Sequence, residues 1–302
     1  MIPYTNHQIS AEDRAAVDAA LTSGRIAQGP LVEEFESRIQ EFVGAKYAVV
    51  FTSGTAALHA AYFALRQLYP LQTFNIPALT FIATANAAEL VTGTPPDLID
   101  VNPYSLCACG DSSNQASALN VAVDYAGHPA YGDYLSKIRS TWWSCIDAAH
   151  SFGAKYKGRM VGGDGRALVT CFSFHPAKLI TTGEGGAIVT ENPDVYGYAR
   201  AFRDPGRLGD GGSQFAAPNY RMTELAAALG ISQLKRAPLF LERRAEIADA
   251  YSTAFRDRRG IEIHTVAHWA ESAWHLYVLR VAPERRDAFR QALESRGVGT
   301  QV

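Results

Sequence analysis

Residues 168–190 read LVTCFSFHPAKLITTGEGGAIVT, in which an apolar run stands at each end of a turn-rich middle. The runs at 168–174 and 186–190 have the length and composition of buried strands. The connection between them is too short for a helical crossover, so part of the sheet can be mixed rather than parallel. Lys178 lies in this connection, after an apolar strand and before a glycine-rich turn.

The position of Lys178 favours a semi-buried amine rather than the solvated surface group that most lysines present. Burial lowers the pKa of a lysine, and the neutral amine is the nucleophile that reacts with a carbonyl group. Asp147 ends the apolar run 143–147, one strand earlier, so both side chains can face one pocket. An Asp at this point is by itself more often a helix cap, but it can also pair with the protonated ring nitrogen of pyridoxal phosphate (PLP).

Predicted strands and helices alternate along most of the chain. The strands are expected at 47–52, 97–101, 120–124, 143–147, 168–174 and 186–190, and the helices at 11–22, 31–42, 55–68, 80–91 and 132–139. This alternation predicts an α/β fold whose largely parallel sheet is covered by helices on both faces.

The last part of the chain is expected to form a separate, smaller unit. The Gly- and Pro-rich stretch 203–219 predicts a loop, and a helical pattern at 222–235 follows it. We therefore assign residues 1–236 to a large domain and 237–302 to a small C-terminal domain. The small domain is predicted to contain helices at 238–258 and 283–296 and a strand at 274–281.

Charge and composition exclude several classes of function. The net charge is −2 and Lys and Arg are scattered, so neither a nucleic-acid nor a membrane surface is expected. The apolar region 47–65 is interrupted by polar residues and cannot span a membrane. Met1 leads directly into polar sequence without the features of a signal peptide, which makes the cytoplasm the default location.

Cysteine and histidine spacing predicts no metal site. The 4 cysteines match neither a zinc-binding pattern nor a disulfide framework, and Cys145 and Cys171 lie in apolar runs typical of core positions. A metal role for Cys107 with Cys109 is the weaker alternative. The remaining pair with helix-like spacing, His264 and His268, is expected at the surface.

Two further segments contain residue types that are typical of ligand sites. The turn Thr52-Ser53-Gly54-Thr55 joins a strand to a helix, whose exposed N–H groups attract phosphate, although an ordinary strand-to-helix turn is the alternative. Asn219-Tyr220-Arg221 follows the long loop, and Asn219 by itself is most simply a helix cap.

Taken together and in this order, these segments resemble the DegT/DnrJ/EryC1/StrS sugar aminotransferases. The resemblance runs from about Tyr4 to the last residue and rests on the segments 147–150, 172–178, 181–186 and 219–221. It implies an α/β protein of the fold-type I PLP-dependent transferase class. Such a protein has a large domain with a mostly parallel, mixed sheet between helices and a smaller C-terminal α+β domain.

The resemblance also implies roles for individual residues around the PLP ring. Lys178 matches the lysine that binds the cofactor covalently, and Asp147 matches the partner of the pyridine nitrogen. His150 is implied beside the ring, near the cofactor's hydroxyl group, and Phe81 matches the aromatic residue that stacks on the ring. Lys178, Asp147 and His150 are thus the catalytic candidates.

A second set of residues is implied around the cofactor's phosphate. Gly54, Thr55 and Ser173 match the phosphate-binding positions of the family. Asn219 matches a residue that reaches the phosphate of the neighbouring subunit's cofactor, which implies a homodimer with shared active sites.

Within the family, the segments 2–4, 27–30, 123–127 and 231–235 resemble the aminotransferases of pseudaminic acid biosynthesis. The resemblance implies that an amino group moves from glutamate to the C4 ketone of a UDP-linked 4-keto-6-deoxy-N-acetyl-hexosamine. Pyridoxamine phosphate would form between the two half-reactions. Tyr4 and Arg221 are the candidate substrate-binding residues.

The end of the sequence departs from the family pattern. Family members continue past a segment like 299–302 with a His-Tyr-x-Pro stretch, so the small domain is expected to be incomplete. A PLP-binding relative that is inactive or regulatory is therefore one alternative. A related sugar dehydratase is a second alternative, which Lys178 disfavours because that branch has histidine at this position.

Other enzyme classes lack support in the sequence. No GxGxxG or Walker-type motif supports a dehydrogenase or a P-loop enzyme. The Ser-, Cys- and Asn-rich stretch 103–118 is assigned no role.

Overall fold

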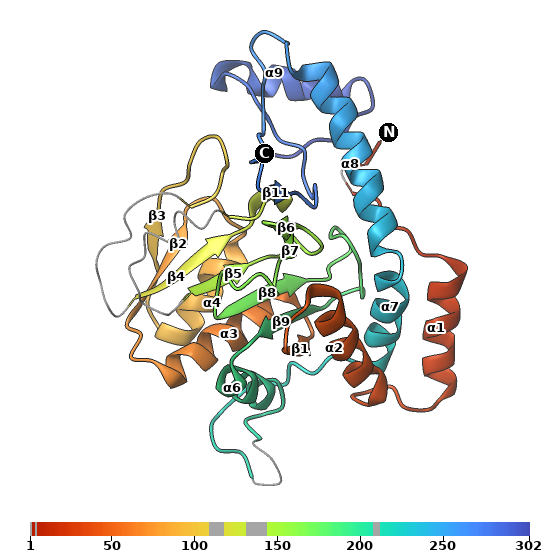
Figure 1. Ribbon diagram of the computed structural model, residues 1–302, viewed down its shortest axis with the longest axis vertical. Helices are drawn as coiled ribbons and strands as arrows, with labels where there is room; N and C mark the ends of the chain where they lie inside the picture. The colour runs from red at the N-terminus through yellow and green to blue at the C-terminus, as the bar shows by residue number, and fades with distance from the viewer. Residues whose placement is uncertain (1, 4, 109–117, 131–143, 208–211) are drawn as a thin grey trace.

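A central sheet of 7 strands organises the larger part of the chain in the computed structural model (Figure 1). The structure describes residues 2–3, 5–108, 118–130, 144–207 and 212–302. In spatial order the strands are β1, β9, β8, β5, β4, β2 and β3. Their bounds are Tyr47–Phe51 (β1), Thr73–Pro77 (β2), Asp97–Ile99 (β3), Ala118–Val123 (β4), Ser144–Asp147 (β5), Val169–Ser173 (β8) and Gly186–Thr190 (β9).

Strand direction determines the edge at which a ligand can bind. Strands β3, β2, β4, β5 and β8 run parallel, whereas β9 pairs antiparallel with both β8 and β1, which confirms the predicted mixed sheet. Asp147 pairs with Cys171 in the parallel register of β5 and β8, so the carboxyl ends of these strands meet at one edge. Ligands of open α/β sheets bind at this edge.

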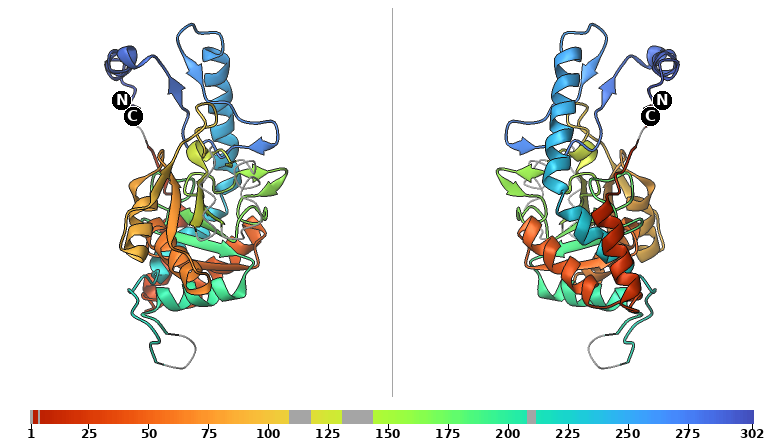
Figure 2. Two further views of the ribbon diagram at one scale, coloured as in Figure 1. Left: turned by 90° about the vertical axis from the view of Figure 1, so that its left-hand side faces the viewer. Right: turned by 90° about the vertical axis from the view of Figure 1, so that its right-hand side faces the viewer.

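Helices cover both faces of the sheet (Figure 1 and Figure 2). They are α1 (Ala11–Thr22), α2 (Pro30–Val43), α3 (Gly54–Leu68), α4 (Ile82–Thr92), α6 (Pro193–Arg203) and α7 (Glu224–Leu234). Helix α2 shows why such segments are helical: Pro30 occupies its first turn, where no N–H partner is needed, and Gly44 ends it in a left-handed conformation. Its buried side chains recur at helical spacing, at Val32, Phe35, Ile39 and Val43.

Apolar side chains fill the space between the sheet and each helical layer. On one face α2 and α7 pack around Phe35 and Phe174, whose ring centroids lie 5.4 Å apart. On the other face α3, α4 and α6 pack around Tyr62 and Phe74, whose ring centroids lie 4.9 Å apart. The central strands are therefore buried on both sides, as the apolar runs in the sequence predict.

A smaller unit follows α7 and projects beyond the sheet (Figure 2). It contains α8 (Ala237–Phe255), β10 (Glu262–Ile263), β11 (Ala270–Glu271), β12 (Leu279–Arg280) and α9 (Pro283–Glu294). Strand β11 pairs with β6 (Lys155–Tyr156), which in turn pairs with β7 (Arg159–Met160). Near the N-terminus, the N–H of Ile2 donates to the carbonyl oxygen of Gly297 (2.7 Å), so both ends of the chain meet in this unit.

Some predicted elements differ from those in the structure. Strand β2 was not predicted because its five residues include Asn75 and Pro77; the side chain of Asn75 is satisfied in the core by donating to Oδ1 of Asn120 (2.8 Å). Helix α6 was also not predicted. The predicted strand 274–281 is wrong except for β12, since Trp274 has a φ of 47° that breaks the extended backbone. The predicted helix 132–139 lies outside the described residues.

The prediction of a surface position for His264 is wrong, whereas His268 is exposed as expected. His264 is only 5 % exposed, and its ring centroid lies 5.5 Å from that of His128. Burial lowers the pKa of His264 to about 4. Cys145 and Cys171 are buried as predicted, and Cys109 lies outside the described residues.

Neither a metal-binding cluster nor a membrane-spanning helix is present among the described residues. In this part of the chain no group of three or more His, Cys, Asp or Glu side chains is arranged to hold a metal ion. The same residues include no helix that is both long and apolar enough to cross a membrane.

We predict opposite effects of alanine at Gly230 and Gly197, which both lie inside helices. A Cβ at Gly230 of α7 would lie 2.5 Å from the ring of Phe35, which is fully buried. The resulting overpacking costs about 1–3 kcal/mol and exceeds the roughly 0.5–1 kcal/mol that alanine contributes inside a helix. Gly230→Ala should therefore lower the free energy of unfolding measured by urea denaturation.

Gly197→Ala is the matched control, because no atom of the described residues lies within 4 Å of the added Cβ in α6. This variant should raise the free energy of unfolding by about 0.5–1 kcal/mol. Equal stability changes in the two variants would contradict the packing described between α2 and α7.

Candidate active site

Asp147 ends β5 and is buried at the carboxyl edge of the sheet. Thr84 of α4 donates from Oγ1 to Oδ2 of Asp147 (2.7 Å), and the N–H of Ala149 donates to Oδ1 (3.1 Å). Burial raises the pKa of the Asp147 carboxyl group, while these hydrogen bonds and the charge of Lys178 oppose that rise. A carboxylate oxygen can accept more than one hydrogen bond, so Asp147 can still bind a cationic N–H group.

Lys178 lies in the turn after β8, where its N–H donates to the carbonyl oxygen of His175 (2.8 Å). Burial lowers the pKa of its amine to about 8; the charge of Asp147 raises this pKa and that of Arg244 lowers it. An ordinary lysine has a pKa of about 10.4, so far more of Lys178 is neutral and nucleophilic near neutral pH. The structure thus brings together the predicted amine and the predicted carboxylate.

His150 lies in the loop after β5 with its ring held in one tautomer. The N–H of Ala126 donates to Nδ1 of His150 (3.3 Å), which leaves the proton of the neutral ring on Nε2. Burial lowers the pKa of His150 to about 3, and the charge of Lys178 adds to this effect. The ring of His275 packs against it, with 4.1 Å between the ring centroids. His150 is therefore neutral and can donate one hydrogen bond from Nε2.

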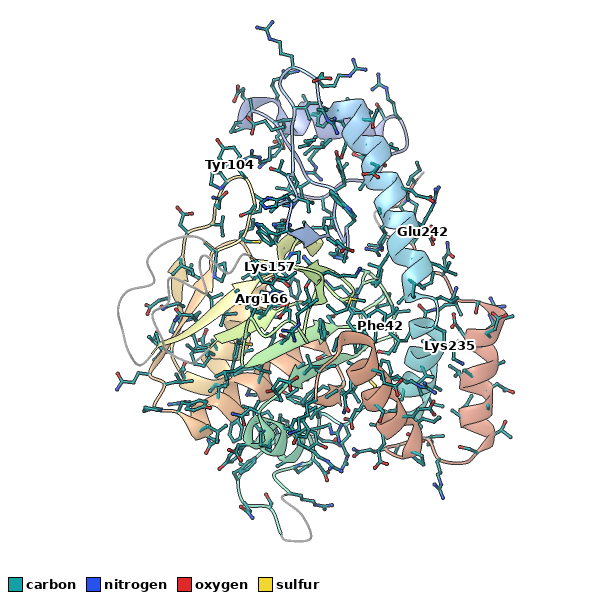
Figure 3. All side chains as sticks on the ribbon, in the orientation of Figure 1. Phe42, Tyr104, Lys157, Arg166, Lys235 and Glu242 are labelled. Atoms are coloured by element: carbon teal, nitrogen blue, oxygen red, sulfur yellow. The ribbon has the colours of Figure 1, made fainter. Side chains whose placement is uncertain are left out.

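A buried ion pair fixes the loop that contains His150. Asp124, at the end of β4, accepts a hydrogen bond from Oγ of Ser151 (2.7 Å). Arg166, labelled in Figure 3, pairs with Asp124 at 3.1 Å and with Asp164 at 2.7 Å. These three charged side chains are at most 4 % exposed, so both ion pairs are shielded from water and salt. Ser151, the residue after His150, is thereby held in place.

The start of α3 lies against the end of β8 with very little space between them. A Cβ at Gly54 would lie 2.8 Å from Cβ of Ser173, and a Cβ at Gly186 would lie 2.5 Å from the carbonyl oxygen of Ser53. The side chain of Ser53 caps the helix by accepting from the N–H of Ala56 (3.1 Å). Thr55 is exposed, and the first N–H groups of α3 point to the edge where an anion can bind.

Phe81 directly precedes α4 and is 72 % exposed. Its carbonyl oxygen accepts from the N–H of Thr84 (3.0 Å), the residue whose hydroxyl group contacts Asp147. The exposed ring is therefore attached to the same turn that positions the buried carboxylate, and its face is free to stack on a planar ligand.

The remaining candidates are Asn219, Arg221 and Tyr4. Asn219 is exposed, and its Oδ1 accepts from the N–H of Arg221 (3.3 Å). Arg221 forms an ion pair with Asp204. The N–H of Thr52 donates to the carbonyl oxygen of Tyr220 (3.1 Å), which places this segment next to the turn before α3. The other substrate-binding candidate, Tyr4, lies outside the described residues.

The structure adds Thr84 to the residues around Asp147, and Arg244, Trp274 and His275 to those around Lys178. Thr84 could have been found from the sequence, since it follows Phe81 by one helical turn. No sequence pattern marked Arg244, which lies in a charged helix, or Trp274 and His275, which lie in a segment predicted as a strand. Arg244, Trp274 and His275 line a cavity of about 290 Å³ that reaches Lys178.

The arrangement at this edge fits PLP in three respects. A buried carboxylate with spare acceptor capacity suits a protonated pyridine nitrogen. A largely buried amine with a pKa of about 8 suits an aldehyde. The start of α3, packed so closely against Ser173 that Gly54 has no room for a Cβ, offers backbone N–H groups to a phosphate.

Comparison with known proteins matches residues 7–302 to the DegT/DnrJ/EryC1/StrS aminotransferase family. The chain belongs to this family. Among similar proteins is the UDP-4-amino-4,6-dideoxy-N-acetyl-beta-L-altrosamine transaminase of Campylobacter jejuni. It is 34 % identical over 320 residues, which cover 100 % of this chain and 83 % of the relative.

Solved structures of family members have the same fold. The Helicobacter pylori aminotransferase PseC, involved in the biosynthesis of pseudoaminic acid, has a TM-score of 0.88 and 29 % identity, covering 97 % of this chain and 82 % of PseC. The putative sugar aminotransferase Spr1654 of Streptococcus pneumoniae, in its pyridoxamine phosphate (PMP) form, has a TM-score of 0.90 and 28 % identity, covering 100 % of this chain and 83 % of Spr1654. The predicted family, fold-type I architecture and aminotransferase class are confirmed.

We predict that Lys178 is acetylated with a pH dependence that differs from that of an exposed lysine. Competitive labelling with acetic anhydride, followed by peptide mass mapping, should give a midpoint near pH 8 for Lys178, because burial lowers its pKa to about 8. Lys155, whose side chain is 38 % exposed, is the internal reference. Asp147→Asn removes a charge that raises this pKa, so the midpoint should fall further.

The direction in which the acetylation midpoint of Lys178 changes in Asp147→Asn is the more specific test. A midpoint for Lys178 that rises in Asp147→Asn, or that coincides with the midpoint for Lys155 in the unsubstituted chain, would contradict the electrostatic relation described between Asp147 and Lys178.

Proposed function

We propose that this chain is a PLP-dependent aminotransferase that moves an amino group from glutamate to the C4 ketone of a UDP-linked 4-keto-6-deoxy sugar. The observation that carries this proposal is the largely buried amine of Lys178 near the buried carboxylate of Asp147. The substrate class is supported by the similarity to the Campylobacter jejuni transaminase and to Helicobacter pylori PseC. The proposal includes a role in pseudaminic acid or related surface-glycan biosynthesis in the cytoplasm, and the similarity to PseC, which is involved in the biosynthesis of pseudoaminic acid, supports the pathway.

Asp147 would hold the proton on the pyridine nitrogen of PLP. When bound, PLP supplies an electron sink that stabilises negative charge developing on the carbon that carries the amino group. The carboxylate is suited to this role because Thr84 and Ala149 fix both of its oxygens. Its burial keeps water from competing for the ring N–H group.

Lys178 would act both as the covalent anchor of the cofactor and as the base. A pKa of about 8 lets Nζ accept and release a proton at near-neutral pH. Nζ would shuttle a proton between the α-carbon of glutamate and the cofactor in the first half-reaction, and between the cofactor and C4 of the sugar in the second.

The other candidate residues would bind and orient the cofactor. His150 is neutral, and its Nε2–H group would donate to the hydroxyl oxygen on the PLP ring. Phe81 would stack on the ring. Gly54, Thr55 and Ser173 would bind the phosphate at the start of α3, where the helix dipole favours negative charge.

The active sites would be shared within a homodimer. Asn219 is exposed, which supports a role toward the phosphate of the partner's cofactor. Arg221 and Tyr4 would contact the nucleotide sugar. Arg221 is suited to this because its ion pair with Asp204 is partly exposed, so a phosphate can compete for the guanidinium group.

We predict that Lys178→Ala abolishes transamination, because in the part of the chain that the structure describes Lys178 is the lysine that lines the cavity and would anchor the cofactor and move the proton. The assay contains PLP, glutamate and a UDP-linked 4-keto-6-deoxy-N-acetyl-hexosamine, and the amino sugar is detected by mass spectrometry. Borohydride reduction of the PLP-loaded chain should attach the cofactor to the peptide that contains Lys178.

Lys155→Ala is the matched control and should retain full turnover, since Lys155 is partly exposed and pairs with Glu271. Turnover in Lys178→Ala, or attachment of the cofactor to another lysine, would refute the assignment. Attachment to Lys178 without transamination would favour a PLP-binding protein without catalysis.

Complementation between inactive variants tests the shared active sites. In a heterodimer of Lys178→Ala and Asn219→Ala chains, one site combines an intact Lys178 with an intact Asn219. Co-expression of the two chains with different tags should therefore restore activity that each variant alone lacks. If the purified heterodimer is inactive while its subunits are folded and bind PLP, Asn219 does not serve the partner's site.

A further inference from the structure

The cavity next to Lys178 carries positive charge that nothing in its lining balances. It has a volume of about 290 Å³ and is formed where α8 and the segment 274–277 meet the turn that contains Lys178. Within the described part of the chain, its lining includes two basic side chains, Lys178 and Arg244, and no carboxylate. Such a cavity favours an anionic ligand.

Arg244 is the strongest indication of a ligand. It is largely withdrawn from water, which lowers its pKa, and no nearby carboxylate acts to restore that pKa. Among the described residues, its guanidinium donates to the carbonyl oxygens of Trp274 and Lys178, both at 3.3 Å. Over the residues that the structure describes, Arg244 forms no ion pair. Buried arginines are normally paired, because an unpaired buried charge is costly.

The guanidinium also has unused hydrogen-bonding capacity. It carries about five N–H donors in a planar fork that matches a carboxylate, and two of them are engaged by the carbonyl oxygens. The remaining donors are available to a ligand in the cavity that Arg244 lines.

His275 provides an independent observation in the same cavity. Its Nδ1 atom is buried and has no hydrogen-bond partner among the residues that the structure describes, although the side chain lines the cavity. Burial and the charges around it keep the pKa of His275 well below its usual range, so the ring is neutral. A neutral imidazole with the proton on Nδ1 donates to a carboxylate, which would satisfy this atom.

The volume of the cavity favours one of the two anionic substrates, glutamate, over the other, the UDP-linked keto sugar. Cavities that enclose drug-sized ligands span roughly 300–1,000 Å³, so about 290 Å³ suits a small amino acid better than an entire nucleotide sugar. The amino group of the donor must also reach Lys178, which opens onto the same cavity.

We propose that Arg244, with Nδ1 of His275, binds a carboxylate of the amino donor, so that this cavity is the donor-carboxylate subsite. The inference rests on the proposed function, because it assumes that an amino acid delivers its amino group at Lys178. The anion-binding chemistry could also serve the diphosphate of the nucleotide sugar, and the experiment separates the two.

Glutarate is the probe, since it has the two carboxylates of glutamate but no amine and cannot react. Its binding is measured by isothermal titration calorimetry on the full chain, with and without PLP, so the result does not depend on catalysis. We expect saturable binding to the unsubstituted chain and at least tenfold weaker binding to Arg244→Gln. The affinity for UDP, measured in the same way, should not change.

Arg243→Gln is the matched control on the same helix. Arg243 is 70 % exposed and pairs with Glu246, so its replacement should leave glutarate binding unchanged. Arg244→Lys keeps the charge but loses the planar fork, and it should bind glutarate with intermediate affinity. Circular dichroism and the thermal melting temperature show whether each variant is folded; if Arg244→Gln does not fold, Arg244→Lys carries the test.

Several results would overturn the proposal. These are the absence of saturable glutarate binding to the unsubstituted chain, equal binding by folded Arg244 variants, or an equal loss of glutarate and UDP binding. Weaker binding of UDP alone would assign the cavity to the nucleotide diphosphate. Failure of the proposed function would instead appear as loss of PLP attachment or of transamination, with glutarate binding intact.

Discussion

The parallel pairing of β5 with β8 is the constraint on which the candidate site depends. It brings Asp147 and the turn that contains Lys178 to one edge of the sheet, where their charges act on each other. Burial disfavours the charged form of both groups, which raises the pKa of the acid and lowers that of the amine. If β8 ran antiparallel to β5, the lysine would lie at the opposite edge and the two groups could not share a ligand.

Contacts between distant segments close the site around this pair. The N–H of Ala273 donates to the carbonyl oxygen of Gly127 (2.9 Å), which docks the smaller unit on the loop after β4. Gly127 has a φ of 96°, and a Cβ there would lie 2.8 Å from the backbone nitrogen of His275, so only glycine allows this approach. Arg244 then bridges the carbonyl oxygens of Trp274 and Lys178. The reactive amine thus lies where the two units meet, a frequent position for ligand sites.

Much of this arrangement could be predicted from the sequence because its signals are local. The apolar runs that end at Asp147 and precede Lys178 are buried strands, and a glycine turn starts α3 after β1. Strand β2 escaped prediction because Asn75 is buried only through its partner Asn120, 45 residues away. His264 appeared to be a surface residue for a similar reason, since its burial against His128 depends on tertiary packing. The positive φ of Trp274 and the contacts of Arg244 with Trp274 and Lys178 depend on the docking of the two units, which no local pattern records.

The central claim is that one buried carboxylate and one buried amine act on the same cofactor. A crystal structure of the PLP-loaded chain tests it most directly. We predict continuous density between Nζ of Lys178 and the cofactor, with a carboxylate oxygen of Asp147 within hydrogen-bond distance of the pyridine nitrogen. Density that joins PLP to another residue, or a ring nitrogen that faces away from Asp147, would contradict the account.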